Sequence, residues 1–150
     1  MSLKVGDLAP EIVLNDQYGN ERSTAKLEKK SLVLIFYPKN NSPICTSQLC
    51  AFRDNYKLFN LYNSEIWGIN NESVYSHNSF CRNLQIPFPL LSDKENKIGK
   101  LYGIKNIFGL NTSRITFVIN EKKINLIHEN LMDSISHIIK SLHILENLRK

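Results

Sequence analysis

The stretch SLVLIFYPKNNSPICTSQLC, residues 31–50, decides the predicted fold. Residues 31–37 form a continuous, mostly apolar run, which is typical of a strand buried on both of its faces. A strand of that kind lies in the interior of a sheet and not at its edge. Pro38 ends the run, because proline has no backbone N–H to donate to a neighbouring strand. We therefore expect residues 31–37 to form a central strand.

A helix is expected soon after this strand. Ser42 suits the cap position and Pro43 the first helical turn, and the helical pattern continues toward Tyr62. Cys45 then falls in the first turn, where unpaired backbone N–H groups and the positive end of the helix dipole favour an anion such as a thiolate. A thiolate in that position is a nucleophile. On these residues alone, a buried structural cysteine is an equally good interpretation.

The rest of the chain alternates between strand and helix patterns, and no repeat or linker divides it. We therefore expect residues 1–150 to form a single domain. The order of elements predicts an α/β thioredoxin-like fold, with a mixed central sheet, flanking helices and an N-terminal hairpin extension. The expected elements are a hairpin formed by residues 11–14 and those after Gly19, a strand at 65–70, a helix at 73–84, an extended piece at 88–91, a short helix at 96–102, a hairpin of 115–119 with 124–127, and a closing helix capped by Asp133.

The closing helix carries an apolar stripe that we interpret as core packing. The stripe consists of Ile135, Ile138, Ile139, Leu142, Leu145 and Leu148. The histidines nearby suggest no site of their own. We expect His128, His137 and His143 to occupy strand-edge or helix-surface positions.

Composition narrows the classes of function. The net charge is +5, but the densest basic groups, Lys29 with Lys30 and Lys122 with Lys123, are not interleaved with aromatics, so no nucleic-acid surface is expected. No apolar run approaches the roughly 18 residues of a membrane span, and no signal-peptide pattern opens the chain, so we expect a cytoplasmic protein without a membrane partner.

Three cysteines do not make a disulfide-stapled scaffold. Disulfides in the cytosol are usually transient, catalytic or sensing, so the cysteines are where chemistry is expected.

Cys50 lies five residues after Cys45 in the same predicted helix. On an ideal helix this spacing puts the two Cα atoms at roughly 8.7 Å. A disulfide needs less than about 7 Å. If the two cysteines bond, the first turns of the helix must unwind, and amide exchange over residues 43–52 should rise on oxidation.

Four blocks of sequence, taken together, resemble the peroxiredoxins, most closely the Q-type group called bacterioferritin comigratory protein. The resemblance covers nearly the whole chain. Its blocks occur in the expected order: Val5-Gly6-Asp7-Leu8-Ala9-Pro10; Pro38, Ser42 and Cys45-Thr46 with Cys50; Phe88-Pro89-Leu90-Leu91-Ser92-Asp93; and Arg114-Ile115-Thr116-Phe117-Val118-Ile119. The chain departs from the group's pattern at three positions. Ser42 stands where Thr is commoner, Ile44 where Gly is usual and Ile12 where Phe is usual.

The resemblance implies a thiol peroxidase without cofactor or metal. Cys45 would attack hydrogen peroxide or an organic hydroperoxide and become a sulfenic acid, Cys50 would close a disulfide with it, and a thioredoxin-type protein would reduce that disulfide. Arg114 would lie beside the thiolate, and Ser42 and Pro38 would shape the pocket. Without the family match, Arg114 is better interpreted as a surface charge at a strand end. Relatives of this type are often monomers, so a monomer is expected, with a dimer as the alternative.

Two alternatives concern the third cysteine, Cys81. Some relatives carry the resolving cysteine on the corresponding helix, so Cys81 could compete with Cys50. A different class of function, a zinc-binding module, would use Cys45, Cys50, His77 and Cys81, because His77 and Cys81 share one helical face. A thioredoxin-like reductase is disfavoured, because its Cys-x-x-Cys pair is missing.

Overall fold

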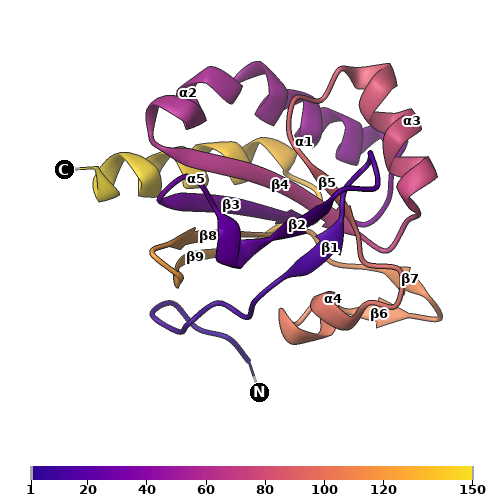
Figure 1. The fold of residues 1–150 in the computed structure, drawn as a ribbon, viewed down its shortest axis with the longest axis horizontal. Helices are drawn as coiled ribbons and strands as arrows, with labels where there is room; N and C mark the ends of the chain where they lie inside the picture. Colours follow the sequence, from indigo (N-terminus) through magenta and orange to yellow (C-terminus); the bar gives the residue numbers. More distant parts are fainter. Residues whose placement is uncertain (1, 150) are drawn as a thin grey trace.

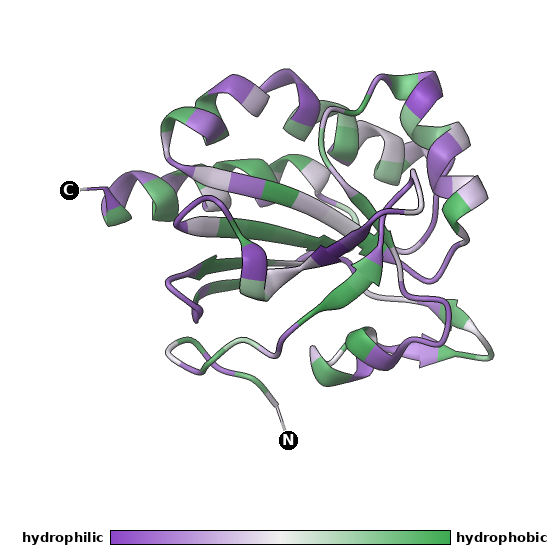
Figure 2. Cartoon of the chain, viewed as in Figure 1, coloured by the Kyte–Doolittle hydropathy of each residue, from purple (hydrophilic) through white to green (hydrophobic). Residues whose placement is uncertain are grey.

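The computed structural model describes residues 2–149, and its centre is a seven-stranded mixed sheet (Figure 1). The strand order is β2-β1-β5-β4-β3-β8-β9. β3 (Ser31–Phe36) lies between β4 (Ser64–Asn70), to which it is parallel, and β8 (Ile115–Asn120), to which it is antiparallel. Every residue of β3 is buried, and Figure 2 shows most of the strand in the hydrophobic colour. The predicted central strand is confirmed.

Two hairpins flank this centre. β9 (Lys123–Glu129) pairs with β8, as expected. On the other side, β5 (Leu90–Ser92) is parallel to β4 and joins β1 (Val13–Asn15), which pairs with β2 (Glu21–Ser23) as the predicted N-terminal hairpin. The mixed α/β fold is therefore the predicted one.

A third, much shorter hairpin was not predicted. β6 (Asn106–Ile107) pairs with β7 (Leu110–Asn111) as a separate two-stranded sheet. Its turn residues, Phe108 and Gly109, both have positive φ, at 51° and 83°. Two-residue strands are too short to show an alternating pattern in the sequence, so no signal was available.

Helices cover both faces of the sheet (Figure 1). On one face lie α1 (Pro43–Asp54), α2 (Tyr56–Leu61), α3 (Val74–Leu84) and α5 (Ser134–Leu148), which pack on the side of β3 that carries Val33 and Ile35. The opposite side, with Leu32 and Leu34, is covered by the N-terminal segment and by the region of α4 (Lys97–Leu101). A short 3-10 helix, η1 (Thr24–Lys26), follows β2. Among residues 2–149, no helix is both long and apolar enough to cross a membrane.

The helix expected from Pro43 toward Tyr62 is two helices that meet at Asn55. The backbone N–H of Asn55 donates to the Ala51 carbonyl, and its side-chain Nδ2 donates to the same oxygen at 2.8 Å. Side-chain bonds of this kind compete with the helical ladder and favour its end. The expectation of one continuous helix is wrong at this residue.

The interpretation of the closing helix is only partly correct. Ile138 and Leu145 are buried, but Ile135 and Ile139 are 47% and 61% exposed. The buried face of α5 includes His137 instead, which is fully buried, so its expected surface position is wrong. A polar side chain can occupy that face because polar groups of the sheet and of the preceding turn meet it there.

Candidate active site

The end of β3 and the start of α1 place Cys45. The chain leaves β3 at Phe36, and Ser42 caps the helix, with its Oγ accepting from the Cys45 backbone N–H at 3.4 Å. Cys45 is therefore in the first turn of α1, as predicted, and it is fully buried. Unpaired N–H groups of a first turn favour negative charge at this position.

Arg114 reaches Cys45 through the register of the sheet. β3 pairs Phe36 with Ile115 of β8, so Arg114, one residue before β8, lies at the same edge as the start of α1. Its Nη2 lies 3.3 Å from the Cys45 Sγ, although 69 residues separate them in sequence. Arg114 is only 2% exposed, so the interpretation as a surface charge at a strand end is wrong.

Two further acceptors hold the Arg114 guanidinium. Nη1 donates to the Gln48 Oε1 at 2.6 Å, and Nε donates to the Leu131 carbonyl at 2.9 Å. None of these partners is a carboxylate, so a buried cation faces neutral oxygens and one sulfur. A buried cation in that situation stabilises negative charge that develops at its remaining contact, the sulfur of Cys45, during a reaction.

Gln48 is a site residue that the sequence interpretation missed. It lies three residues after Cys45 on the same face of α1 and is fully buried. The i, i+3 spacing was a usable signal, because such residues are neighbours on a helix. Only the position of Arg114 gives the amide its role, and that position depends on the sheet.

A surface hollow of about 630 Å³ adjoins the site. Pro38 and Ser42 line it, as expected, whereas Ile44 is half-buried and lies outside the lining. The unpredicted β6–β7 hairpin supplies part of one wall. The full lining is Pro38, Lys39, Asn40, Ser42, Asn71, Glu72, Leu110, Asn111 and Thr112.

A buried polar network fixes the loop between β3 and α1. The Tyr37 hydroxyl donates to Asn40 Oδ1 at 2.7 Å, and Asn40 Nδ2 donates to His77 Nδ1 at 3.0 Å. His77 Nε2 must be the protonated nitrogen, because it lies 2.9 Å from the Leu91 carbonyl, which can only accept. Burial lowers the pKa of His77 to about 4, which keeps the ring neutral, and burial raises the pKa of Tyr37. Glu72 completes the network by accepting from the Asn40 backbone N–H.

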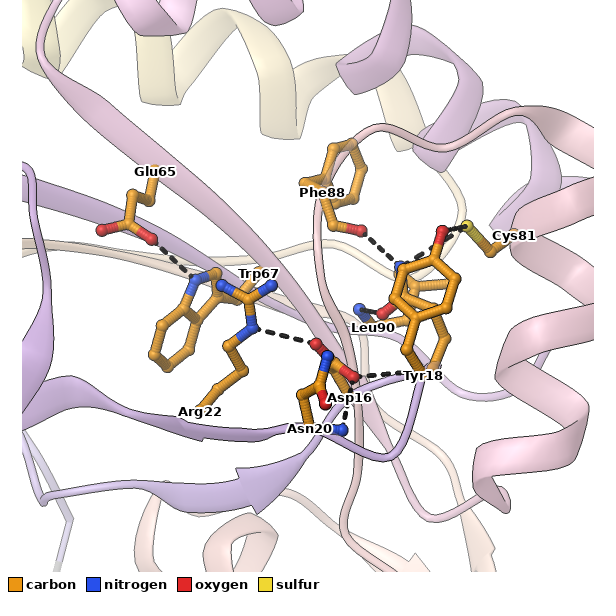
Figure 3. A network of polar contacts seen from close by, with 10 residues as sticks. Asp16, Tyr18, Asn20, Arg22, Glu65, Trp67, Cys81, Phe88 and Leu90 are labelled. Carbon is orange, nitrogen blue, oxygen red and sulfur yellow. Dashed lines mark hydrogen bonds and ion pairs between the residues drawn. The ribbon is translucent and has the colours of Figure 1, made fainter.

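The other two cysteines occupy different surroundings. All three are free thiols, and Cys50 is half-buried in the same helix as Cys45. Cys81 is buried on α3, where Figure 3 shows it beside Tyr18 and near Phe88 and Leu90. Its Sγ lies 3.4 Å from the Gln17 amide nitrogen and donates to the Ile86 carbonyl at 3.2 Å.

These contacts do not support the zinc-binding alternative. Both ring nitrogens of His77 already have protein partners, and the Cys81 thiol is engaged with Ile86. Among residues 2–149, no three side chains of the metal-binding types gather in one place. Cys45, Cys50, His77 and Cys81 therefore do not form a ligand set.

A thioredoxin-like fold that places a buried thiol at a helix start, against a buried guanidinium, defines the class of thiol peroxidases. Residues 5–127 match the model of the AhpC/TSA family. The chain is 37% identical over 145 residues to the chloroplastic peroxiredoxin Q of Triticum aestivum, covering 95% of this chain and 67% of the relative. It is 36% identical to that of Sedum lineare, covering 96% of this chain and 78% of the relative.

Solved structures agree with these sequence matches. Peroxidoxin BcpB from Mycobacterium tuberculosis superposes with a TM-score of 0.93 at 29% identity, covering 99% of both chains. Peroxiredoxin Q from Xanthomonas campestris gives 0.86 at 25% identity, covering 99% of this chain and 98% of that one. The chain belongs to the AhpC/TSA family and is a thiol-dependent peroxidase, an oxidoreductase. The family implies a peroxide substrate and a thioredoxin-type reductant.

Proposed function

We propose that Cys45 is the peroxidatic nucleophile and that Cys50 resolves its oxidised form. The observation that carries this assignment is the 3.3 Å contact between Arg114 Nη2 and the Cys45 Sγ, in the first turn of α1. The guanidinium and the helix start both favour the thiolate, which is the reactive form of cysteine. Ser42 and Pro38 line the neighbouring hollow, and we propose that a peroxide approaches Cys45 from this side.

The first step forms an S–O bond and breaks the O–O bond. The Cys45 thiolate attacks one oxygen of the peroxide and becomes the sulfenic acid, while the second oxygen leaves with the electron pair and takes a proton, as water or an alcohol. Negative charge moves from the sulfur to the departing oxygen. Arg114 stabilises this shift, because its N–H donors are fixed before the reaction begins.

The second step restores the thiol through a disulfide. The Cys50 thiolate attacks the Cys45 sulfur, an S–S bond forms, and hydroxide leaves and is protonated to water. Two thiols of a thioredoxin-type protein then reduce the disulfide and become a disulfide themselves. Both cysteines lie inside the continuous helix Pro43–Asp54, so the start of α1 must open before Cys50 can reach Cys45.

Cys81 is the second candidate for the resolving role. It is buried and its thiol donates to a backbone carbonyl, so α3 would also have to rearrange. Mass spectrometry of the oxidised protein distinguishes the two linkages. A bond between Cys45 and Cys50 supports the proposed assignment, and a bond between Cys45 and Cys81 overturns it.

The decisive experiment is peroxide-dependent oxidation of reduced thioredoxin by this protein. We expect turnover with hydrogen peroxide and with an organic hydroperoxide, and complete loss in Cys45→Ser, because a hydroxyl is a far weaker nucleophile than a thiolate. Cys81→Ser is the matched control, since it removes a second buried thiol whose partners are Gln17 and the Ile86 carbonyl. Activity that survives in Cys45→Ser would contradict the proposal.

Two further properties are proposed on the sequence alone. We propose that the protein acts as a monomer, with a dimer as the alternative, and light scattering of the reduced and oxidised forms decides between them. We also propose a cytoplasmic location, whereas the plant relatives are named as chloroplastic proteins. Fractionation of cells that produce the protein tests the location.

A further inference from the structure

His137 on α5 is buried next to the anchor of Arg114. Its Nε2 lies 2.8 Å from the Asn130 carbonyl, and its Nδ1 lies 2.8 Å from the Thr116 hydroxyl. A carbonyl only accepts, so Nε2 carries the proton, and the neutral ring then accepts the Thr116 hydroxyl proton at Nδ1. The imidazole therefore ties the strand β8 to the turn that precedes α5.

That turn, residues 130–133, presents a carbonyl to the active-site arginine. Leu131 O accepts from Arg114 Nε at 2.9 Å, and the Asn130 N–H donates to the Arg114 carbonyl at 3.2 Å. The Asn130 side chain closes the turn, with Oδ1 accepting from the backbone N–H groups of Met132 and Asp133. The direction of the Leu131 carbonyl therefore depends on how Asn130 is held.

One nitrogen of the Arg114 guanidinium contacts Cys45, and the hydrogen bonds of the other two fix the orientation of the group. Nε is set by Leu131 and Nη1 by Gln48, which leaves Nη2 on the Cys45 Sγ. A guanidinium is planar and rigid, so turning it at Nε moves Nη2 away from the sulfur. The Leu131 carbonyl and the Gln48 amide together therefore set the direction in which Nη2 points.

We propose that His137 is a positioning residue for the peroxidatic site, holding the 130–133 turn so that Leu131 orients Arg114 against Cys45. This inference rests on the proposed function of Cys45. His137 does not line the hollow, so its proposed role is to hold the groups that orient Arg114. Both of its ring nitrogens bond to groups close to Arg114. Nε2 donates to the carbonyl of Asn130, whose own N–H donates to the Arg114 carbonyl, and Nδ1 accepts from Thr116, two residues after Arg114.

The ring is neutral at neutral pH, so Nδ1 carries no proton and can accept from the Thr116 hydroxyl. Burial lowers the pKa of His137 to about 4, the Asn130 carbonyl opposes this shift, and His128 and Arg114 add to it. Asp133, which caps α5, raises the pKa slightly. His128 packs edge-on against the ring with centroids 4.7 Å apart.

The test compares His137→Leu with His143→Leu, which removes an exposed histidine of the same helix. Three readouts are measured: hydrogen exchange of the Arg114 Nε–H by NMR, thiolate absorbance at 240 nm in a Cys50→Ser, Cys81→Ser background, and kcat/KM for peroxide. We expect His137→Leu to speed the exchange, reduce the absorbance and lower kcat/KM by about ten- to a hundredfold. His143→Leu should behave like the parent, and His137→Gln should recover most of the loss, because an amide also offers a donor and an acceptor.

A folded His137→Leu protein with parental exchange, absorbance and kcat/KM would overturn the inference. If that variant fails to fold, Thr116→Val decides, because it removes only the hydroxyl that holds Nδ1. Faster exchange of the Arg114 Nε–H in Thr116→Val supports the role of His137, and unchanged exchange overturns it. The first two readouts need no turnover, so a parent protein without peroxidase activity would defeat the proposed function separately.

Discussion

Cys45 and Cys81 are both buried on helices of the same layer, with 0% and 3% of their surface exposed. They differ in their partners. Cys45 faces the Arg114 guanidinium, whereas Cys81 lies among an amide, a carbonyl and the Tyr18 hydroxyl, all of them neutral (Figure 3). The hydrogen bond with Cys81 raises the pKa of Tyr18, so this phenol is protonated at neutral pH. Both thiols are buried, so the buried cation, and not burial, is what distinguishes the proposed nucleophile from Cys81.

Removal of the Arg114 guanidinium is expected to have the largest effect on the difference between Cys45 and Cys81. Arg114→Leu should lower kcat/KM for peroxide by about 10² to 10³, the range for loss of one fixed donor to a developing charge. Arg114→Lys should recover only part of the lost activity, because an ammonium keeps the charge but lacks the planar set of N–H donors of a guanidinium. The control is Arg22→Leu, which removes an arginine that pairs with Asp16 on the hairpin beside Cys81. Equal losses in Arg114→Leu and Arg22→Leu would abolish the distinction between the two regions.

The second-largest effect is expected from acidification, which should lower the free energy of unfolding through His77, on the helix that carries Cys81. His77 lies on α3 with Cys81, and burial lowers its pKa to about 4 from an ordinary value of 6.5. Above pH 6.5 both the folded and the unfolded protein hold this ring neutral, so its stabilisation is complete. As pH falls from 6.5 toward 4, only the unfolded chain takes the proton, and up to roughly 3 kcal/mol of unfolding free energy is lost.

Denaturant unfolding at several pH values measures this loss. His77→Gln should flatten the dependence between pH 6.5 and 4, whatever its own stability at neutral pH. His137, whose pKa burial also lowers to about 4, keeps part of the dependence in that variant. His143→Gln, at an exposed position of α5, should leave the slope as it is. An unchanged slope in His77→Gln would argue against a neutral buried ring.

The smallest expected effect is a difference in amide exchange between α1 and α3 in the oxidised protein. After one equivalent of peroxide, amide exchange over residues 43–52 should rise about tenfold or more, because the proposed disulfide between Cys45 and Cys50 requires α1 to open. Residues 74–84 of α3 should keep their protection. Increased exchange in α3 as well would mean that Cys81 takes part in the cycle.

Much of the fold follows from local pattern. The apolar run 31–37 is typical of a central strand, and Ser42 with Pro43 sets where α1 begins, so the position of Cys45 in a first turn is a property of the sequence. The end of α1 was not predictable from periodicity, because Asn55 ends it with a side-chain bond to Ala51. The β6–β7 hairpin, which forms part of the wall of the hollow, carries too few residues for a pattern.

The sequence by itself determined the central strand, the capped helix and the position of Cys45 in its first turn, because each depends on residues a few positions apart. The expectation that Arg114 lies beside Cys45 came from the family resemblance, and only the tertiary structure shows how that contact is made. The β3–β8 register carries Arg114 to Cys45, and the turn before α5 brings Leu131 and His137 to Arg114. These contacts join residues far apart in the chain, and a periodic pattern contains no information about which distant groups will meet.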